Sequence, residues 1–202
     1  MDASNIEALY RDQNPGSALD FGKLARIIES WEIDLVAMYI FLPQRPNNEG
    51  YLGFLSSSGY RVVSKPVRDV FDGSGGEAIG RKANFDVEIA VTMTLMATGG
   101  RIDEFYLLSG DSDFEFLIKA IQQMPYAIRV NVFSPRQGTA AELKRFADRF
   151  ISMDEYFEGL SKSNGRVRTT GTRREAVLAE PVRVEVEAVS VTPGTDNGGP
   201  HD

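Results

Sequence analysis

Four aspartates stand where this sequence passes from an apolar or loop segment into a helical pattern. Asp111 and Asp113 follow the apolar run of "YLLSGDSDFEFLI", Asp86 opens the apolar run "DVEIAV", and Asp2 precedes a helical pattern near the start. Like charges that lie close together raise one another's pKa and repel unless a cation neutralises them. Carboxylate oxygens without histidine or cysteine ligands suit magnesium or manganese rather than zinc. The four aspartates are therefore candidate ligands of Mg²⁺ or Mn²⁺.

Composition removes most other kinds of site. The 202 residues include no cysteine, which excludes disulfides, thiol nucleophiles and cysteine-type zinc sites. The one histidine, His201, lies next to the last residue, so a nucleophile with a histidine base is not expected. The "GDSD" run therefore lacks the base of an esterase, and "DSDF" lacks the residue that usually follows in haloacid-dehalogenase-type phosphatases. Chemistry has to come from carboxylates, hydroxyls, lysines and arginines.

Charge and hydropathy indicate where such a protein works. The net charge is −7, and all of this negative excess lies in residues 1–160. An acidic surface keeps a protein soluble, and part of the excess could also gather in one cleft that needs a cation. No run approaches the roughly 20 apolar residues that span a membrane, and the start lacks the basic and apolar regions of a signal peptide. The sequence predicts a cytoplasmic protein without a membrane partner.

Apolar runs alternate with helical patterns, and these are the elements that must position the aspartates. Strands that alternate with helices indicate βαβ units, a mostly parallel sheet and helices on both faces, which is a three-layer α/β/α fold. Function in such sheets lies at the carboxyl ends of the strands, where Asp111 and Asp113 fall. We expect helices at 20–31, 47–59, 85–97, after Asp113 and at 139–147, strands at 33–42, 60–67, 104–109 and 128–134, and a loop at 71–84.

Four segments taken together resemble a known family. "DASN", "KANFDVEIAV", "LLSGDSDFEFLI" and "AAELKRFADRFISMDEYF" are similar, in this order, to the NYN domain and to its LabA-like members within the PIN-like nuclease superfamily. The resemblance covers roughly residues 1–157, and the SGDSDF element is its most specific part. It implies a Rossmann-like α/β/α fold and acidic residues that hold a divalent metal for hydrolysis of RNA phosphodiester bonds.

The resemblance also assigns roles to individual residues. Asp2 stands at the family's first aspartate and Asn5 at its companion. Asp86 stands at the aspartate of the family's K-x-x-D pair, one residue farther from the lysine than usual. Asp111 and Asp113 stand at the two aspartates of SGDSDF. These four aspartates are the metal ligands and catalytic residues that the resemblance implies.

Further polar residues have supporting roles in this prediction. Lys82, the lysine of the K-x-x-D pair, is a predicted contact to the RNA substrate, and a solvated loop lysine is the plainer interpretation. Hydroxyl and amide side chains beside the metal ligands are predicted to orient them by hydrogen bonds. They are Asn5, Ser109 and Ser112.

Two positions depart from the family. Many relatives carry another aspartate six residues after the K-x-x-D aspartate, where this chain has Thr92. Relatives also place several apolar residues, the central strand, ahead of the first aspartate, whereas only Met1 precedes Asp2 here. Either the first strand is missing from this chain or the start is assigned late. The alternative to a ribonuclease is a non-catalytic RNA-binding or regulatory module with a degenerate acidic site. A homodimer or a protein complex stays open.

The aspartates also have an interpretation without chemistry. An aspartate at a helix start accepts hydrogen bonds from free backbone N–H groups and is stabilised by the helix dipole. Asp86 alone could be such a cap, and so could one residue of the pair Asp111 and Asp113. One cap needs only one carboxylate, so the second aspartate of the pair stays unexplained.

Residues 161–202 differ in composition from residues 1–160, which we expect to form one domain. The stretch Lys162–Arg174 contains five basic residues and no acidic one, which predicts a flexible arm. The stretch Val182–Val191 alternates like a strand without an evident partner. The arm is either a solubilising linker or a phosphate-binding segment that acts through Arg166, Arg168, Arg173 and Arg174.

Overall fold

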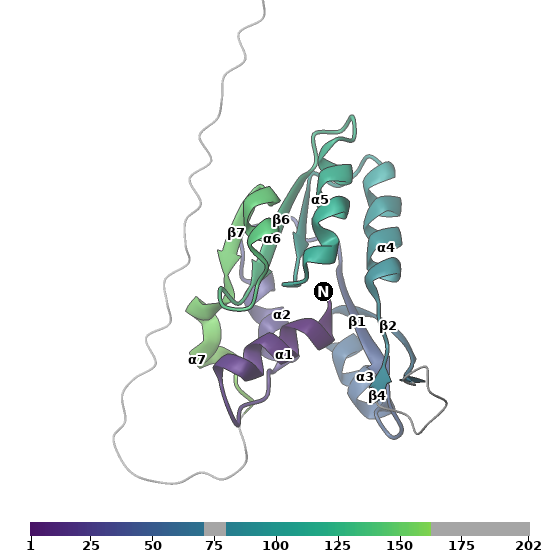
Figure 1. Ribbon diagram of the computed structural model, residues 1–202, viewed down its shortest axis with the longest axis vertical. Coiled ribbons are helices and arrows are strands. Elements are labelled where there is room, and N and C mark those ends of the chain that lie inside the picture. The colour runs from purple at the N-terminus through teal and green to yellow at the C-terminus, as the bar shows by residue number, and fades with distance from the viewer. Residues whose placement is uncertain (71–79, 163–202) are drawn as a thin grey trace, which may run out of the picture. The chain divides into compact units, whose positions relative to one another are not determined.

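The structure, a computed structural model, describes residues 1–70 and 80–162, without the side chains of residues 68–70 and 80–82. The predicted tail lies outside the described residues from position 163 onward. Helices and strands alternate along the described chain (Figure 1). They are α1 Ala3–Gln13, α2 Phe21–Glu29, β1 Met38–Gln44, α3 Glu49–Ser57, β2 Tyr60–Pro66, β3 Arg68–Val70, β4 Gly80–Lys82, α4 Asp86–Thr98, β5 Glu104–Leu107, the 3-10 helix η1 Ser112–Phe114, α5 Glu115–Gln122, β6 Arg129–Ser134, α6 Ala141–Phe146, β7 Arg149–Ser152, the 3-10 helix η2 Met153–Tyr156 and α7 Phe157–Leu160.

Parallel strands form two groups that the first residues of the chain connect. β1 pairs with β2, and β5, β6 and β7 pair in that order. Asp2 forms an isolated parallel bridge with Phe41 of β1. The Asp2 N–H donates to the carbonyl of Leu108, just beyond β5, at 2.9 Å. The order across the sheet is therefore β2, β1, the dipeptide Met1–Asp2, β5, β6 and β7, while β3 and β4 form a separate antiparallel pair.

Side chains of the strands alternate between two apolar cores, one on each face of the sheet. Met38, Ile40 and Leu42 of β1 pack with α1 and α2 on one face. Phe105 and Leu107 of β5 pack with α4 and α5 on the other. Figure 1 shows α4 and α5 side by side. The three-layer α/β/α prediction is confirmed.

Most expected elements form, and two boundaries were wrong. α2 begins directly after Asp20, whose carboxylate accepts a hydrogen bond from the Lys23 N–H at 3.1 Å. β1 begins at Met38 instead of residue 33, because its partner β2 begins at Tyr60, opposite Met38. Residues 33–37 therefore have no position of β2 to pair with. Residues 71–79 of the expected loop 71–84 lie outside the described residues, and Gly80–Lys82 form β4, which pairs with β3.

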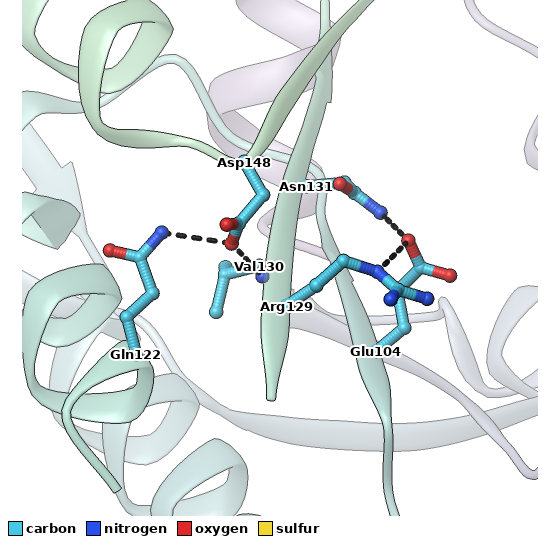
Figure 2. Close-up of polar contacts among 6 residues, drawn as sticks. All are labelled: Glu104, Gln122, Arg129, Val130, Asn131 and Asp148. Atoms are coloured by element: carbon cyan, nitrogen blue, oxygen red, sulfur yellow. Dashed lines mark hydrogen bonds and ion pairs between the residues drawn. The ribbon is translucent and has the colours of Figure 1, made fainter. Parts of the chain in front are cut away.

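Two carboxylates fasten β6 to its neighbours (Figure 2). Asp148, ahead of β7, accepts hydrogen bonds from a β6 backbone N–H at 2.7 Å and from the Gln122 amide at 2.8 Å. Glu104 of β5 accepts from the buried Asn131 and forms an ion pair with Arg129. Both acids are thus structural, since they satisfy polar groups within the sheet. In the part of the chain that the structure describes, no helix is long and apolar enough to cross a membrane.

Candidate metal site

Three carboxylates meet at one edge of the sheet. One oxygen each of Asp86, Asp111 and Asp113 lies within 4.8 Å of the others. Asp86 is the first residue of α4, and the other two flank the start of η1, beyond the carboxyl end of β5. Asp86 and Asp111 are half-buried and Asp113 is exposed. The structure therefore brings together three of the four predicted ligands.

The loop that carries Asp111 is clamped by two helices that are distant in sequence. The Gly110 N–H donates to the side-chain oxygen of Asn5 in α1 at 2.8 Å, and the Gly110 carbonyl accepts from the Ala140 N–H at 3.0 Å. A Cβ at position 110 would lie 2.6 Å from a methyl carbon of Leu9 and 3.2 Å from the Cα of Thr139. A side chain at position 110 would have to displace Leu9 and press against the Thr139 backbone, so α1 and the start of α6 limit the position of the loop.

Local hydrogen bonds orient Asp111 within that loop. Its N–H donates to the hydroxyl of the buried Ser109 at 3.3 Å. One of its carboxylate oxygens accepts from the Asp113 N–H at 3.1 Å and caps η1. Ser112 is exposed. Among the predicted supporting residues, Asn5 and Ser109 thus hold the Asp111 loop.

Asp86 is positioned by a residue that the sequence analysis missed. The Asp86 N–H donates to the side-chain oxygen of Asn84 at 2.8 Å. An asparagine two residues ahead of a helix can form such a turn, and this was the available signal. The N-cap residue of α4 is Phe85, which provides no side-chain cap. Asp86 is thus the first residue of α4 and not its N-cap. Gly110 was the other residue missed, because its two tertiary contacts leave no local signal.

Asp2 is placed differently from the other three aspartates. It is 9% exposed, and its carboxylate accepts a hydrogen bond from the Asn5 N–H at 3.2 Å as the N-cap of α1. Burial raises the pKa of Asp2, and the charges of Asp86 and Asp111 add to this rise, while the Asn5 N–H and the N-terminus oppose it. Asp2 therefore feels the charges of the site, although it is not one of the three clustered carboxylates.

Helix capping explains only part of this arrangement. It accounts for one oxygen of Asp2 and one oxygen of Asp111. It does not account for the Asp86 carboxylate, nor for three acids that converge within 4.8 Å. Among the side chains that the structure describes, no lysine or arginine forms an ion pair with any of the three.

The donor set fits a hard divalent cation. Magnesium binds oxygen ligands at about 2.0–2.1 Å in an octahedron, which separates its ligand atoms by about 3–4 Å. Three carboxylate oxygens within 4.8 Å of one another are close enough to share one such ion. Water and phosphate oxygens complete octahedral sites of this kind.

The remaining predicted residues lie away from the carboxylate cluster or outside the residues that the structure describes. Lys82 belongs to β4, and its side chain is not among those described. Thr92 is half-buried and lines a cavity between β1 and β5, so it is not part of the carboxylate cluster. The four predicted phosphate contacts of the tail lie outside the described residues: Arg166, Arg168, Arg173 and Arg174.

The fold is a parallel sheet with helices on both faces, and an acidic cluster lies at the carboxyl edge of the sheet. Comparison with known proteins identifies the class of protein that has these features. The family model of the NYN domain matches residues 1–154, and the chain belongs to this family of PIN-like proteins. The low amplitude and bright protein LabA of Synechococcus elongatus is 31% identical over 134 residues, which cover 65% of this chain and 70% of that protein.

A solved structure supports the same fold. A protein of unknown function from Vibrio parahaemolyticus matches with a TM-score of 0.63 at 25% sequence identity. The match covers 79% of this chain and 91% of the Vibrio chain. The parallel strands and flanking helices are therefore shared with a solved protein.

Proposed function

We propose that this protein is a Mg²⁺- or Mn²⁺-dependent ribonuclease that hydrolyses RNA phosphodiester bonds. The observation that carries the proposal is the convergence of Asp86, Asp111 and Asp113 within 4.8 Å. The chain's membership of a PIN-like nuclease family supports RNA as the substrate. The three acids come from two separate segments of the chain, and the fold itself does not require three acids to lie side by side.

The residues of the site have distinct roles in this proposal. Asp86, Asp111 and Asp113 would hold the metal, with the buried Asp2 beside them. A bound divalent ion supplies two effects, a lower pKa for water and stabilisation of negative charge on the phosphate, so no histidine is needed. Asn5 and Ser109 keep the Asp111 loop in place. The N-terminal turn of α4, which begins at Asp86, adds N–H groups and a dipole that favour a phosphate.

Lys82 and the four tail arginines stay predicted phosphate contacts in this proposal. Their positive charge would offset the repulsion between an acidic protein and a polyanion. A cytoplasmic location is consistent with an RNA substrate and stays a prediction.

An RNA cleavage assay with and without manganese tests the proposal. Wild-type protein is expected to cleave single-stranded RNA only with the metal, and Asp111→Asn to lose cleavage by at least about 100-fold, since it removes a charged ligand. Asp12→Asn is a matched control, because Asp12 is an exposed aspartate of α1. Equal metal-dependent cleavage by wild type and Asp111→Asn would contradict the proposal.

The second candidate is a non-catalytic RNA-binding module. Two observations favour it, since Asp2 lies outside the group of three and Thr92 occupies the position of a family aspartate. This candidate predicts RNA binding without cleavage at any metal concentration. It also predicts that Asp111→Asn leaves the RNA affinity in EDTA unchanged or raises it, because a negative charge is removed from the surface.

A further inference from the structure

Two exposed apolar side chains lie beside the carboxylate cluster of Asp86, Asp111 and Asp113. Phe116 is 81% exposed and Val87 is 72% exposed, which are the two largest fractions among the large apolar side chains that the structure describes. Val87 directly follows Asp86 in the first turn of α4, and Phe116 lies in the first turn of α5. Single exposed apolar residues are common on protein surfaces. Two of them beside the same three acids indicate a ligand with an apolar part.

Helix geometry places Phe116 on the same side of its segment as Asp113. Residues three apart in a helix have their Cβ atoms about 5–6 Å apart, and η1 continues directly into α5. Leu117, Ile118 and Ile121 of α5 are buried in the core, whereas Asp113 and Phe116 are both exposed. The Phe116 ring therefore stands within about one helical turn of the cluster.

The first turn of α4 brings Val87 to the same edge of the sheet. Its neighbour Asp86 has one oxygen within 4.8 Å of carboxylate oxygens of Asp111 and Asp113. α4 packs against α5 and η1, and Figure 1 shows α4 and α5 side by side. Buried residues of α4 such as Ile89 face the core, while Val87 stays exposed. Two neighbouring helices thus each carry a cluster acid and an exposed apolar side chain.

A ligand of this site needs a negatively charged part and a flat apolar part. A nucleotide has both, because its phosphate suits a metal held by the acids and its base suits an aromatic ring. Proteins that bind single-stranded RNA stack bases on aromatic side chains. A base inside a duplex is already paired and stacked on its neighbours, so it has no free face for the ring. The site therefore fits an unpaired nucleotide.

We propose that Phe116 is a stacking platform for the base of an unpaired RNA nucleotide whose phosphate lies at the carboxylate cluster, with Val87 as a second apolar contact. Both residues then select single-stranded over double-stranded RNA. Every base has a π face, so this selection concerns strandedness and not sequence. The inference rests on the RNA substrate of the proposed function, and it does not require cleavage.

RNA binding by the full chain, measured in EDTA so that no metal-dependent cleavage occurs, tests the proposal. Phe116→Ala should weaken the affinity for single-stranded RNA by at least about 5-fold, the lower end for one stacked base. The acids without metal repel RNA equally in both proteins, so the ratio of affinities reports the ring. The slope of log affinity against log salt should stay unchanged, because no phosphate contact is lost. The affinity for double-stranded RNA of the same sequence should also stay unchanged.

Further substitutions separate stacking from general apolar contact. Phe116→Trp keeps a π face and should bind single-stranded RNA at least as tightly as the wild type. Phe116→Leu is apolar without a π face and should resemble Phe116→Ala. Leu95→Ala is the matched control, because Leu95 is a 68% exposed residue of α4 that lies about 12 Å from Val87 along the helix. Its RNA affinity should equal that of the wild type.

The outcomes distinguish this proposal from the ribonuclease proposal. A wild type that does not cleave RNA, but loses single-strand affinity on Phe116→Ala, would contradict the ribonuclease and support the platform. Cleavage that depends on Asp111, together with unchanged RNA affinity of Phe116→Ala, would overturn the platform alone. Full affinity in Phe116→Leu, equal losses in Phe116→Ala and Leu95→Ala, or no RNA binding by the wild type would overturn it too. So would a wild-type dimer that Phe116→Ala converts to a monomer, because the ring would then belong to a protein interface.

Discussion

Of the four aspartates, Asp2 has the surroundings that most disfavour the ionised carboxylate. It is buried, whereas Asp113 is exposed, and burial opposes its ionised form. The nearby charges of Asp86 and Asp111 oppose that form further. A divalent cation in the cluster would reverse these effects, because a positive charge favours ionised carboxylates. Asp2 can thus tune the site without being one of the three clustered ligands.

The raised pKa of Asp2 gives a pH-dependent prediction in metal-free buffer. Because its folded-state pKa lies above the ordinary value of 3.8, the folded protein prefers protonated Asp2. The wild type should therefore lose stability relative to Asp2→Asn as the pH rises from 3.8 through the raised pKa. Asparagine keeps the N-cap of α1. Melting temperatures of both proteins across this range check it, and a difference that is independent of pH would contradict it.

At the scale of elements, the Asp111 loop depends on packing between segments that are far apart in sequence. A Cβ at position 110 would meet Leu9 of α1 and Thr139, which precedes α6. The replacement Gly110→Ala should cost about 1–3 kcal/mol by overpacking and displace the loop. Thermal unfolding measures this cost. Gly53→Ala is the control, because no atom lies within 4 Å of a Cβ there, and alanine in a helix should be neutral or stabilising by up to about 1 kcal/mol. Equal melting temperatures for the two variants would contradict the clamp.

Local patterns predict most of the elements but not the contacts between them. The alternation of apolar strands and amphipathic helices suffices for the three-layer fold, and the strand-to-helix change around Asp111 suffices to mark a site. The start of β1 depends on where β2 begins, and the separation of Asp2 from the cluster depends on tertiary packing. Gly110 matters through Leu9 and Thr139, which are distant in sequence. Contacts between residues that are distant in sequence cannot be predicted from a short stretch of that sequence.

At the scale of the whole molecule, an acidic body is combined with a basic stretch beyond the described residues. The described chain continues to Lys162, and Ser161 bonds the Tyr10 hydroxyl at 2.7 Å. Deletion should therefore begin at residue 163. Removing residues 163–202 should weaken RNA binding and reduce the slope of log affinity against log salt, because fewer phosphates are neutralised. Binding titrations at several salt concentrations measure this slope. An unchanged slope would show that the arm is a linker.

The most direct test of the metal site is a manganese titration followed by thermal melting. For the wild type, manganese at about 100 times its dissociation constant should add about 2.7 kcal/mol, or about 5–10 °C. The variant Asp111→Asn should lose this shift, while its metal-free melting temperature should stay level or rise slightly, because repulsion within the cluster is relieved. Asp12→Asn should keep the shift. Equal manganese shifts in wild type and Asp111→Asn would contradict the metal site and leave helix capping as the role of Asp111.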